Sequence, residues 1–245
     1  MNKSAGDIER FVMATPKVEL HLHLEGAIPL ETLLSLIQRK GGEPSIKTVE
    51  DLRKKLVYQD FKHFLAIWAW KHTFITEEED FEEIVYQVLA DLSRQNVKYV
   101  EAFYSPMPMV SRRWGLSVKL ITDCLIRGKE RAYRDFGIRS ELILDLVRDY
   151  GPEKGMQLLT ELTPYVGKGI IGIGIGGMSR NTLPNCSYLC TKKPKNVVSD
   201  LLLTLVKLRG LIPYGLLLKN CMLSVSDTEC GLMRIQHSCL YWESG

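Results

Sequence analysis

Long apolar runs are missing from this sequence, and so is a large excess of either charge. No window reaches the ~18 continuous apolar residues that a membrane-spanning helix needs. The first residues, MNKSAGDIERF, lack the apolar core of a signal peptide. The net charge of +3 is small and scattered, which argues against nucleic acid or a membrane surface as a partner. These absences favour a cytoplasmic protein.

Cysteine is scarce over most of the chain. Cys124 stands alone in the first 177 residues, and the other five cysteines crowd the last 68. The nearest pair, Cys186 and Cys190, has the spacing C-x-x-x-C, which matches neither a zinc ribbon nor a redox C-x-x-C motif. Because nothing marks the chain as secreted, we expect no disulfide framework.

The remaining composition is that of a globular α/β protein, with 45% apolar and 25% charged residues in a chain of 245. Apolar runs typical of strands alternate with amphipathic segments typical of helices. The clearest helix follows a predicted capping box, Thr76-x-x-Glu79, and its apolar residues from Phe81 to Leu92 recur at helical spacing. We predict strands at 18–24, 97–106, 138–148 and 169–177, and helices at 29–42, 116–135 and 152–165.

A strand followed by a helix, repeated four times, predicts a parallel sheet. The insertion 44–95 should add helices that cover one end of this sheet. A complete barrel of eight such units typically needs about 250 residues, and four units already use 177. The remaining 68 residues cannot hold four more units, so from the pattern alone we predict an α/β fold with a parallel sheet.

Two histidines, His21 and His23, lie two residues apart in the strand segment VELHLHLEGA. Side chains at this spacing point to the same face of a strand. The pair lies near the C-terminal end of the first strand, where parallel barrels place their sites, and neutral imidazole is a common zinc ligand. The pair is either half of a metal site or a pair of core histidines satisfied by hydrogen bonds.

PKVELHLHLEGAI resembles the N-terminal signature of the adenosine deaminase family, and YVEAFYSP and GIGIGG resemble its second and fourth strands. The resemblance covers about residues 14–177. It implies a (β/α)8 barrel hydrolase, of which this chain would form the N-terminal half, with one zinc ion, and this enzyme would remove the 6-amino group of adenosine or deoxyadenosine. Related purine deaminases act on adenine, AMP or modified purines, and adenine or another aminopurine stays an alternative substrate.

The resemblance also implies roles for individual residues. His21 and His23 match the first two zinc ligands, and Glu25 matches a position that bonds the ribose. Gly177 matches the glycine whose backbone meets the purine. Phe64 and Trp68, in a segment that resembles the helical flap over the purine pocket, fall where apolar groups line its entrance; ordinary helix packing is the alternative for both. We read His63, His72 and Ser105 as surface, packing or turn residues.

The family's later motifs are missing, namely H-A-G-E, G-H-G and a D-D pair, and the only later histidine is His237. No catalytic acid or base can therefore be assigned, and two imidazoles leave zinc short of the three or four ligands that catalytic sites use. Residues 178–245 also change in composition, with eight basic and four acidic residues and a leucine-rich stretch without clear periodicity.

A slip of one base after Gly177 would explain this break. Each intended codon would then join the last base of one present codon to the first two of the next. In that single frame Asp200–Leu208 permits H-A-G-E, Cys221–Gly231 permits G-H-G, and Met178–Cys186 permits E-Q-E-Y-P-P-E-L-F, in the order of the family. The alternative is a divergent C-terminal module.

We therefore expect two parts: residues 1–177 as an incomplete deaminase barrel, and residues 178–245 as an out-of-frame tail, poorly ordered, that ends at a chance stop. The chain as written should lack useful catalysis. A different hypothesis is a catalytically dead fragment that binds a complementing half. Open sheet edges would also invite self-association.

Overall fold

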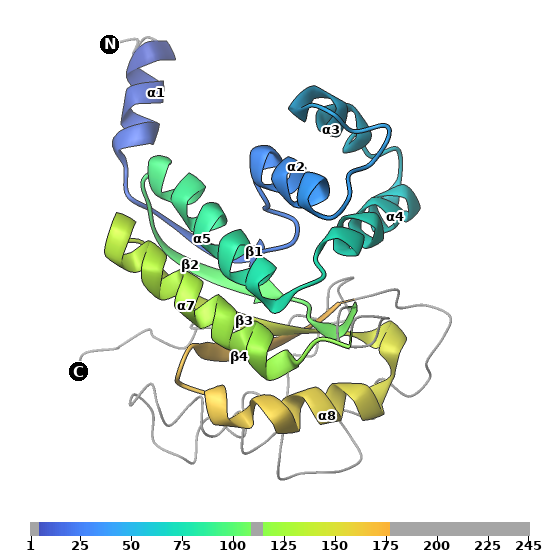
Figure 1. The fold of residues 1–245 in the computed structure, drawn as a ribbon. Coiled ribbons are helices and arrows are strands. Elements are labelled where there is room, and N and C mark those ends of the chain that lie inside the picture. The colour runs from blue at the N-terminus through green and yellow to red at the C-terminus, as the bar shows by residue number, and fades with distance from the viewer. Residues whose placement is uncertain (1–4, 109–114, 177–245) are drawn as a thin grey trace, which may run out of the picture. The chain divides into compact units, whose positions relative to one another are not determined.

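The computed structural model describes residues 5–108 and 115–176 (Figure 1). Gly177 and the predicted tail 178–245 lie outside the described residues. The chain divides into two units, Met1–Leu144 and Asp145–Gly245, and each is considered by itself.

Four strands form a sheet in the order of the chain: β1 (Lys17–His23), β2 (Val97–Tyr104), β3 (Arg139–Val147) and β4 (Ile170–Gly176). β1 pairs with β2, and β2 with β3, in parallel. Each strand lies within two residues of its predicted limits. The predicted parallel sheet is thus confirmed. The prediction succeeded because buried strands of such sheets are continuous apolar runs, which can be recognised from local sequence.

The helices of the first unit are α1 (Ala5–Ala14), α2 (Leu30–Arg39), α3 (Val49–Lys55), α4 (Phe61–Lys71), α5 (Glu78–Arg94) and α7 (Val118–Phe136). A short 3-10 turn, His72–Phe74, follows α4. The insertion therefore contributes α3 and α4, as predicted. Helix α1 was not predicted. Its apolar side chains at Ile8, Phe11 and Val12 are 48–66% exposed, so no buried face reinforces the pattern.

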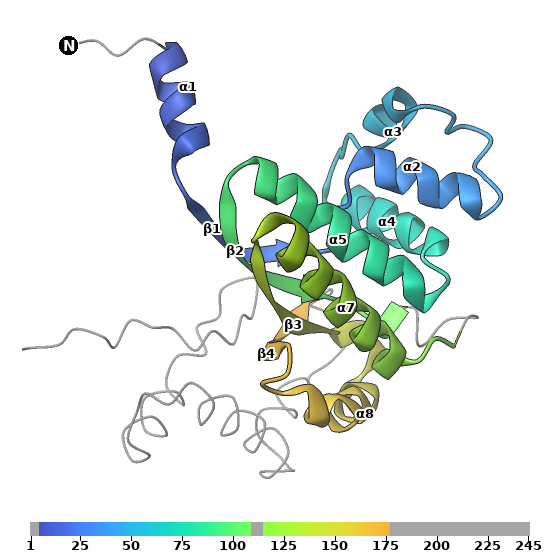
Figure 2. The same ribbon diagram turned by 60° about the vertical axis from the view of Figure 1, so that its left-hand side comes forward.

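Helices α5 and α7 lie side by side, as Figures 1 and 2 both show. The predicted apolar face of α5 is buried: Phe81, Ile84, Val85, Val88 and Leu89 are at most 1% exposed. Gly128 of α7 lies against α5 so closely that an added Cβ would stand 2.5 Å from the carbonyl oxygen of Glu82. A side chain at this position would push the two helices apart.

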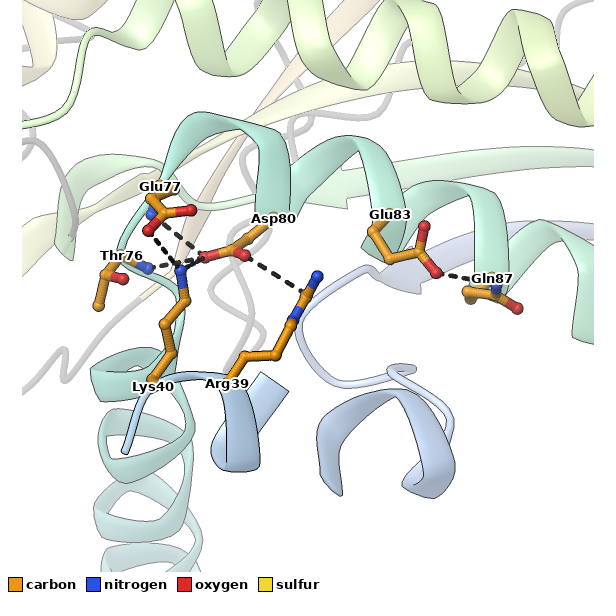
Figure 3. Close-up of polar contacts among 7 residues, drawn as sticks. All are labelled: Arg39, Lys40, Thr76, Glu77, Asp80, Glu83 and Gln87. Atoms are coloured by element: carbon orange, nitrogen blue, oxygen red, sulfur yellow. Dashed lines mark hydrogen bonds and ion pairs between the residues drawn. The ribbon is translucent and has the colours of Figure 1, made fainter. Parts of the chain in front are cut away.

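The start of α5 corrects the predicted capping box by one residue. The N-cap is Glu77, and the carboxylate that reaches back belongs to Asp80 (Figure 3). Asp80 Oδ2 accepts the backbone N–H groups of Thr76 and Glu77 at 3.0 and 3.1 Å. Lys40, at the end of α2, contacts Glu77 Oε1 at 2.9 Å and Asp80 Oδ2 at 3.2 Å. The shift follows from this tertiary ion pair, which favours the buried Asp80 over Glu79 as the capping carboxylate.

The second unit contains α8 (Pro152–Leu162), which begins with proline at its first turn, where the missing N–H has no helical partner to lose. We predicted a helix over 152–165. The α-helix ends at Leu162, and Thr163–Tyr165 continue as a 3-10 turn. Leu158, Leu159 and Leu162 are each 2% exposed and form the buried face of α8. Across the described residues, no helix combines the length and the apolar content needed to cross a bilayer.

Candidate metal centre

The two histidines of β1 lie together at the C-terminal end of the strand. His21 Nε2 and His23 Nε2 are 3.3 Å apart. Both rings contact the side chain of Phe103 on β2, with ring centroids 4.6 Å away for His21 and 5.1 Å for His23. Strand alternation brings the imidazoles to one face, and Phe103 restricts both ring planes.

The spacing of the two nitrogens fits one zinc ion. Ligand nitrogens about 2.0–2.1 Å from a tetrahedral zinc lie about 3.3–3.4 Å apart. Burial lowers the pKa of His23, which favours the neutral imidazole that binds metal. Within residues 5–108 and 115–176, no third His, Cys, Asp or Glu completes a cluster. The described part of the chain therefore offers two candidate ligands, fewer than the three typical of catalytic zinc.

Glu25 lies in the turn directly after the histidine pair, and it is buried, with 1% exposure. Its Oε1 atom accepts the backbone N–H of Ser105 at 2.6 Å, and the side chain of Lys71 donates to its backbone oxygen at 2.7 Å. Ser105, which follows β2, is itself 2% exposed. Its N–H anchors Glu25, a role more specific than the turn residue that we predicted. The loop after β1 is thus held from both β2 and α4.

Sequence reasoning missed Lys71 and Phe103. Lys71 ends α4 and is 4% exposed. Burial lowers the pKa of Lys71, and the charge of Glu25 opposes that shift. The lysine lies in an otherwise apolar segment, FLAIWAWK, and a lone charge in such a segment is a signal that could have drawn attention to it. Phe103 carried no such signal, because an aromatic residue in a buried strand is ordinary.

The aromatic residues predicted at the pocket entrance lie on α4. Phe64 packs edge-on against Tyr58, with centroids 5.1 Å apart, and Trp68 packs against His72 at 3.8 Å. These contacts fit the packing alternative, and a role toward substrate stays a prediction. His72 is fully buried and its Nδ1 atom bonds the carbonyl of Trp68, which confirms it as a packing residue. His63 Nδ1 accepts the N–H of Gln59.

Gly177, the predicted purine contact, lies outside the described residues. Its neighbour Gly176 ends β4, where an added Cβ would stand 3.4 Å from the carboxylate of Asp145.

Comparison with known proteins identifies the class to which this fold and histidine pair belong. The family model described as "Adenosine deaminase" matches residues 16–189, most of the chain. The chain belongs to the adenosine deaminase family. The match extends past Gly177, so the domain boundary at that residue stays a prediction.

Two relatives and one solved structure illustrate the similarity. An uncharacterised deaminase of Schizosaccharomyces pombe is 35% identical over 178 residues, which cover 73% of this chain and 52% of the relative. Adenine deaminase of Saccharomyces cerevisiae is 30% identical over 199 residues, covering 79% and 57%. A zinc-bound amidohydrolase from Burkholderia ambifaria aligns with a TM-score of 0.62 and 26% identity, covering 83% of this chain and 52% of that one. The chain thus spans about half the length of the proteins it matches.

Proposed function

We propose that this chain is the N-terminal half of a zinc-dependent deaminase that removes the 6-amino group of an adenine-type purine. The observation that carries the proposal is the 3.3 Å spacing of His21 Nε2 and His23 Nε2 at the end of β1. The bound zinc of the Burkholderia structure supports a metal at this site. The name of the Saccharomyces relative, adenine deaminase, supports an amino group of a purine as the group that is removed. One zinc ion would lower the pKa of a bound water, so that hydroxide is available near neutral pH.

The residues of this chain would prepare the centre. His21 and His23 would hold the metal through Nε2, and Phe103 contacts both of their rings. Glu25 fixes the turn after His23 against β2 through its bond to Ser105. Phe64, Trp68 and Gly177 are the proposed substrate contacts, and the family resemblance alone supports them.

Adenosine and deoxyadenosine are the first candidate substrates, giving inosine or deoxyinosine and ammonia. Adenine is the second, and the name of the Saccharomyces relative, adenine deaminase, supports it.

For the 245-residue chain itself, we propose a cytoplasmic fragment without turnover. The family motifs after strand four are absent from its sequence, and the shifted frame permits two of them, H-A-G-E and G-H-G, in order. We infer that residues 178–245 are translated out of phase. The competing hypothesis is a dead fragment that binds a complementing half.

Sequencing the coding DNA around codon 177 tests the frame directly. A gene whose shifted codons do not spell H-A-G-E and G-H-G would refute the slip. A frame-restored protein, loaded with zinc, should release ammonia from adenosine or adenine, and the ratio of the two kcat/KM values decides between the substrates. No turnover of any aminopurine would overturn the deaminase proposal.

Alanine substitutions test the metal ligands in the frame-restored protein. H21A or H23A should lower kcat/KM more than a hundredfold, beyond the ~10–100-fold typical of residues that only support a ligand. H63A is the matched control, because His63 bonds Gln59 within the insertion, and it should retain activity. The 245-residue chain should release no ammonia above background with zinc, and a measurable rate would show that other residues replace the missing ligands.

A further inference from the structure

Lys71 joins the helical insertion to the loop that follows the histidine pair. It is the last residue of α4, and its Nζ atom donates to the backbone oxygen of Glu25 at 2.7 Å, across 46 residues of sequence. Only 4% of the residue is exposed. A buried ammonium group is costly unless it is paired and hydrogen-bonded, so this contact is a specific one.

The charge of Lys71 is balanced by the residue it holds. Burial lowers the pKa of Lys71, and the nearby carboxylate of Glu25 favours its charged form. The same carboxylate accepts the N–H of Ser105 at 2.6 Å, at the end of β2. Glu25 is therefore held at two points: Lys71 of α4 bonds its backbone oxygen, and Ser105, directly after β2, bonds its side chain.

The two hydrogen bonds to Glu25 restrain the turn that begins at His23. The N–H groups of Gly26 and Ala27 both donate to the backbone oxygen of His23, at 2.9 and 3.0 Å. Glu25 lies inside this turn, so a displacement of its backbone must move the turn and the end of β1. The chain connects this turn to the end of α4 only through the residues between Glu25 and Lys71, whereas the hydrogen bond of Lys71 joins them directly.

We propose that Lys71 is a positioning residue that holds the β1–α2 turn, and with it the imidazole of His23, in the geometry that binds a metal. The insertion is thereby coupled to the metal centre, and α4 does more than pack over the fold. This inference rests on the proposed function for the meaning of the metal site, but the effect on the turn can be measured without it.

The test compares K71M with K129M in the 245-residue chain. Methionine keeps the apolar stem and removes the ammonium donor. Lys129, on α7, is a matched control. Its Nζ also donates to a backbone oxygen, that of Ser140 on β3 at 2.8 Å, and it pairs with the side chain of Glu141 on the same strand. Two quantities are measured: amide hydrogen exchange at Gly26 and Ala27, and the affinity for Zn²⁺ alone by calorimetric titration.

K71M should speed exchange at Gly26 and Ala27 at least tenfold and weaken Zn²⁺ binding about tenfold, whereas K129M should leave both unchanged. Equal exchange at the two amides in K71M and the parent would overturn the proposal, as would equal effects from K129M. If the parent binds no Zn²⁺, the two histidines of this chain do not hold the ion by themselves, and the exchange rates still decide whether Lys71 holds the turn.

K71R provides a second test if K71M does not fold. Arginine keeps the charge, but its planar guanidinium presents its donors in a fixed fork, so it does not reproduce the geometry of the Lys71 contact. We expect faster exchange at Gly26 and Ala27 with a melting temperature like that of K129R. A turn as protected in K71R as in the parent would contradict a positioning role for the lysine.

Discussion

At the scale of single residues, the buried carboxylate of Asp80 organises the junction of α2 and α5 (Figure 3). Its side chain is 4% exposed and meets Lys40, which is 13% exposed. Burial lowers the pKa of Lys40, but hydrogen bonds to Glu77 and Asp80 outweigh it, so the pKa is raised. The hydrogen bond from Lys40 in turn lowers the pKa of Glu77. The ion pair thus links two helices, α2 and α5, that have α3 and α4 between them in the sequence.

K40M should remove a stabilisation that depends on pH. Because the pKa of Glu77 is lowered in the folded state, its contribution is present above its ordinary value of 4.5 and is lost as the pH falls through the folded pKa. The raised pKa of Lys40 has the opposite sign, and its contribution is lost as the pH rises beyond 10.5. The difference in free energy of unfolding between parent and K40M should therefore shrink at both extremes.

Urea denaturation at a series of pH values measures this difference. The exposed Lys62 offers the control, since K62M should change stability little at any pH. A parent-to-K40M difference that stays constant from about pH 7 down to about pH 3 would contradict the ion-pair account.

At the scale of elements, the close approach of α5 and α7 decides the packing on one side of the first unit. Gly128 permits this approach, because an added Cβ would stand 2.4 Å from Val85 Cγ1 and 2.5 Å from the Glu82 backbone oxygen. A clash with a side chain can relax by rotation, but a clash with a carbonyl oxygen requires the helices to separate. The glycine therefore fits the helix–helix contact despite its low helix propensity.

G128A should destabilise the protein by about 1–3 kcal/mol, the usual cost of overpacking, although alanine favours helix by itself. Chemical denaturation provides the measurement. E130A, at an exposed position of the same helix, should change the free energy of unfolding by less than about 0.5 kcal/mol. Greater stability in G128A would mean that α5 and α7 tolerate a wider separation.

At the scale of the whole molecule, β1 is at the edge of the described sheet, and on it Val18 and Leu20 are 63% and 43% exposed. Exposed apolar edge strands pair with other chains, and proteins commonly protect such edges with lysine. Complete barrels avoid the problem, because their first and last strands pair.

The 245-residue chain should therefore self-associate as its concentration rises, and the double substitution V18K with L20K should weaken the association. Sedimentation velocity measures both. V57K is the control, because Val57 is 66% exposed but lies in the insertion, away from the sheet. A chain that remains monomeric at every concentration, or an equal effect from V57K, would count against the open edge as the contact.

The sequence by itself determined the four strands, the buried side of α5 and the placement of the histidine pair on one face. Strand alternation places His21 and His23 on one face, and helical spacing gives α5 its buried side, because both patterns depend on neighbours a few residues apart. Only the tertiary structure decided what holds the pair in place. Phe103 under both rings, Ser105 bonded to Glu25 across 80 residues and Lys71 bonded to Glu25 across 46 are contacts between segments that only packing brings together. No local periodicity encodes such contacts, since they depend on how the strands align and where the insertion folds back.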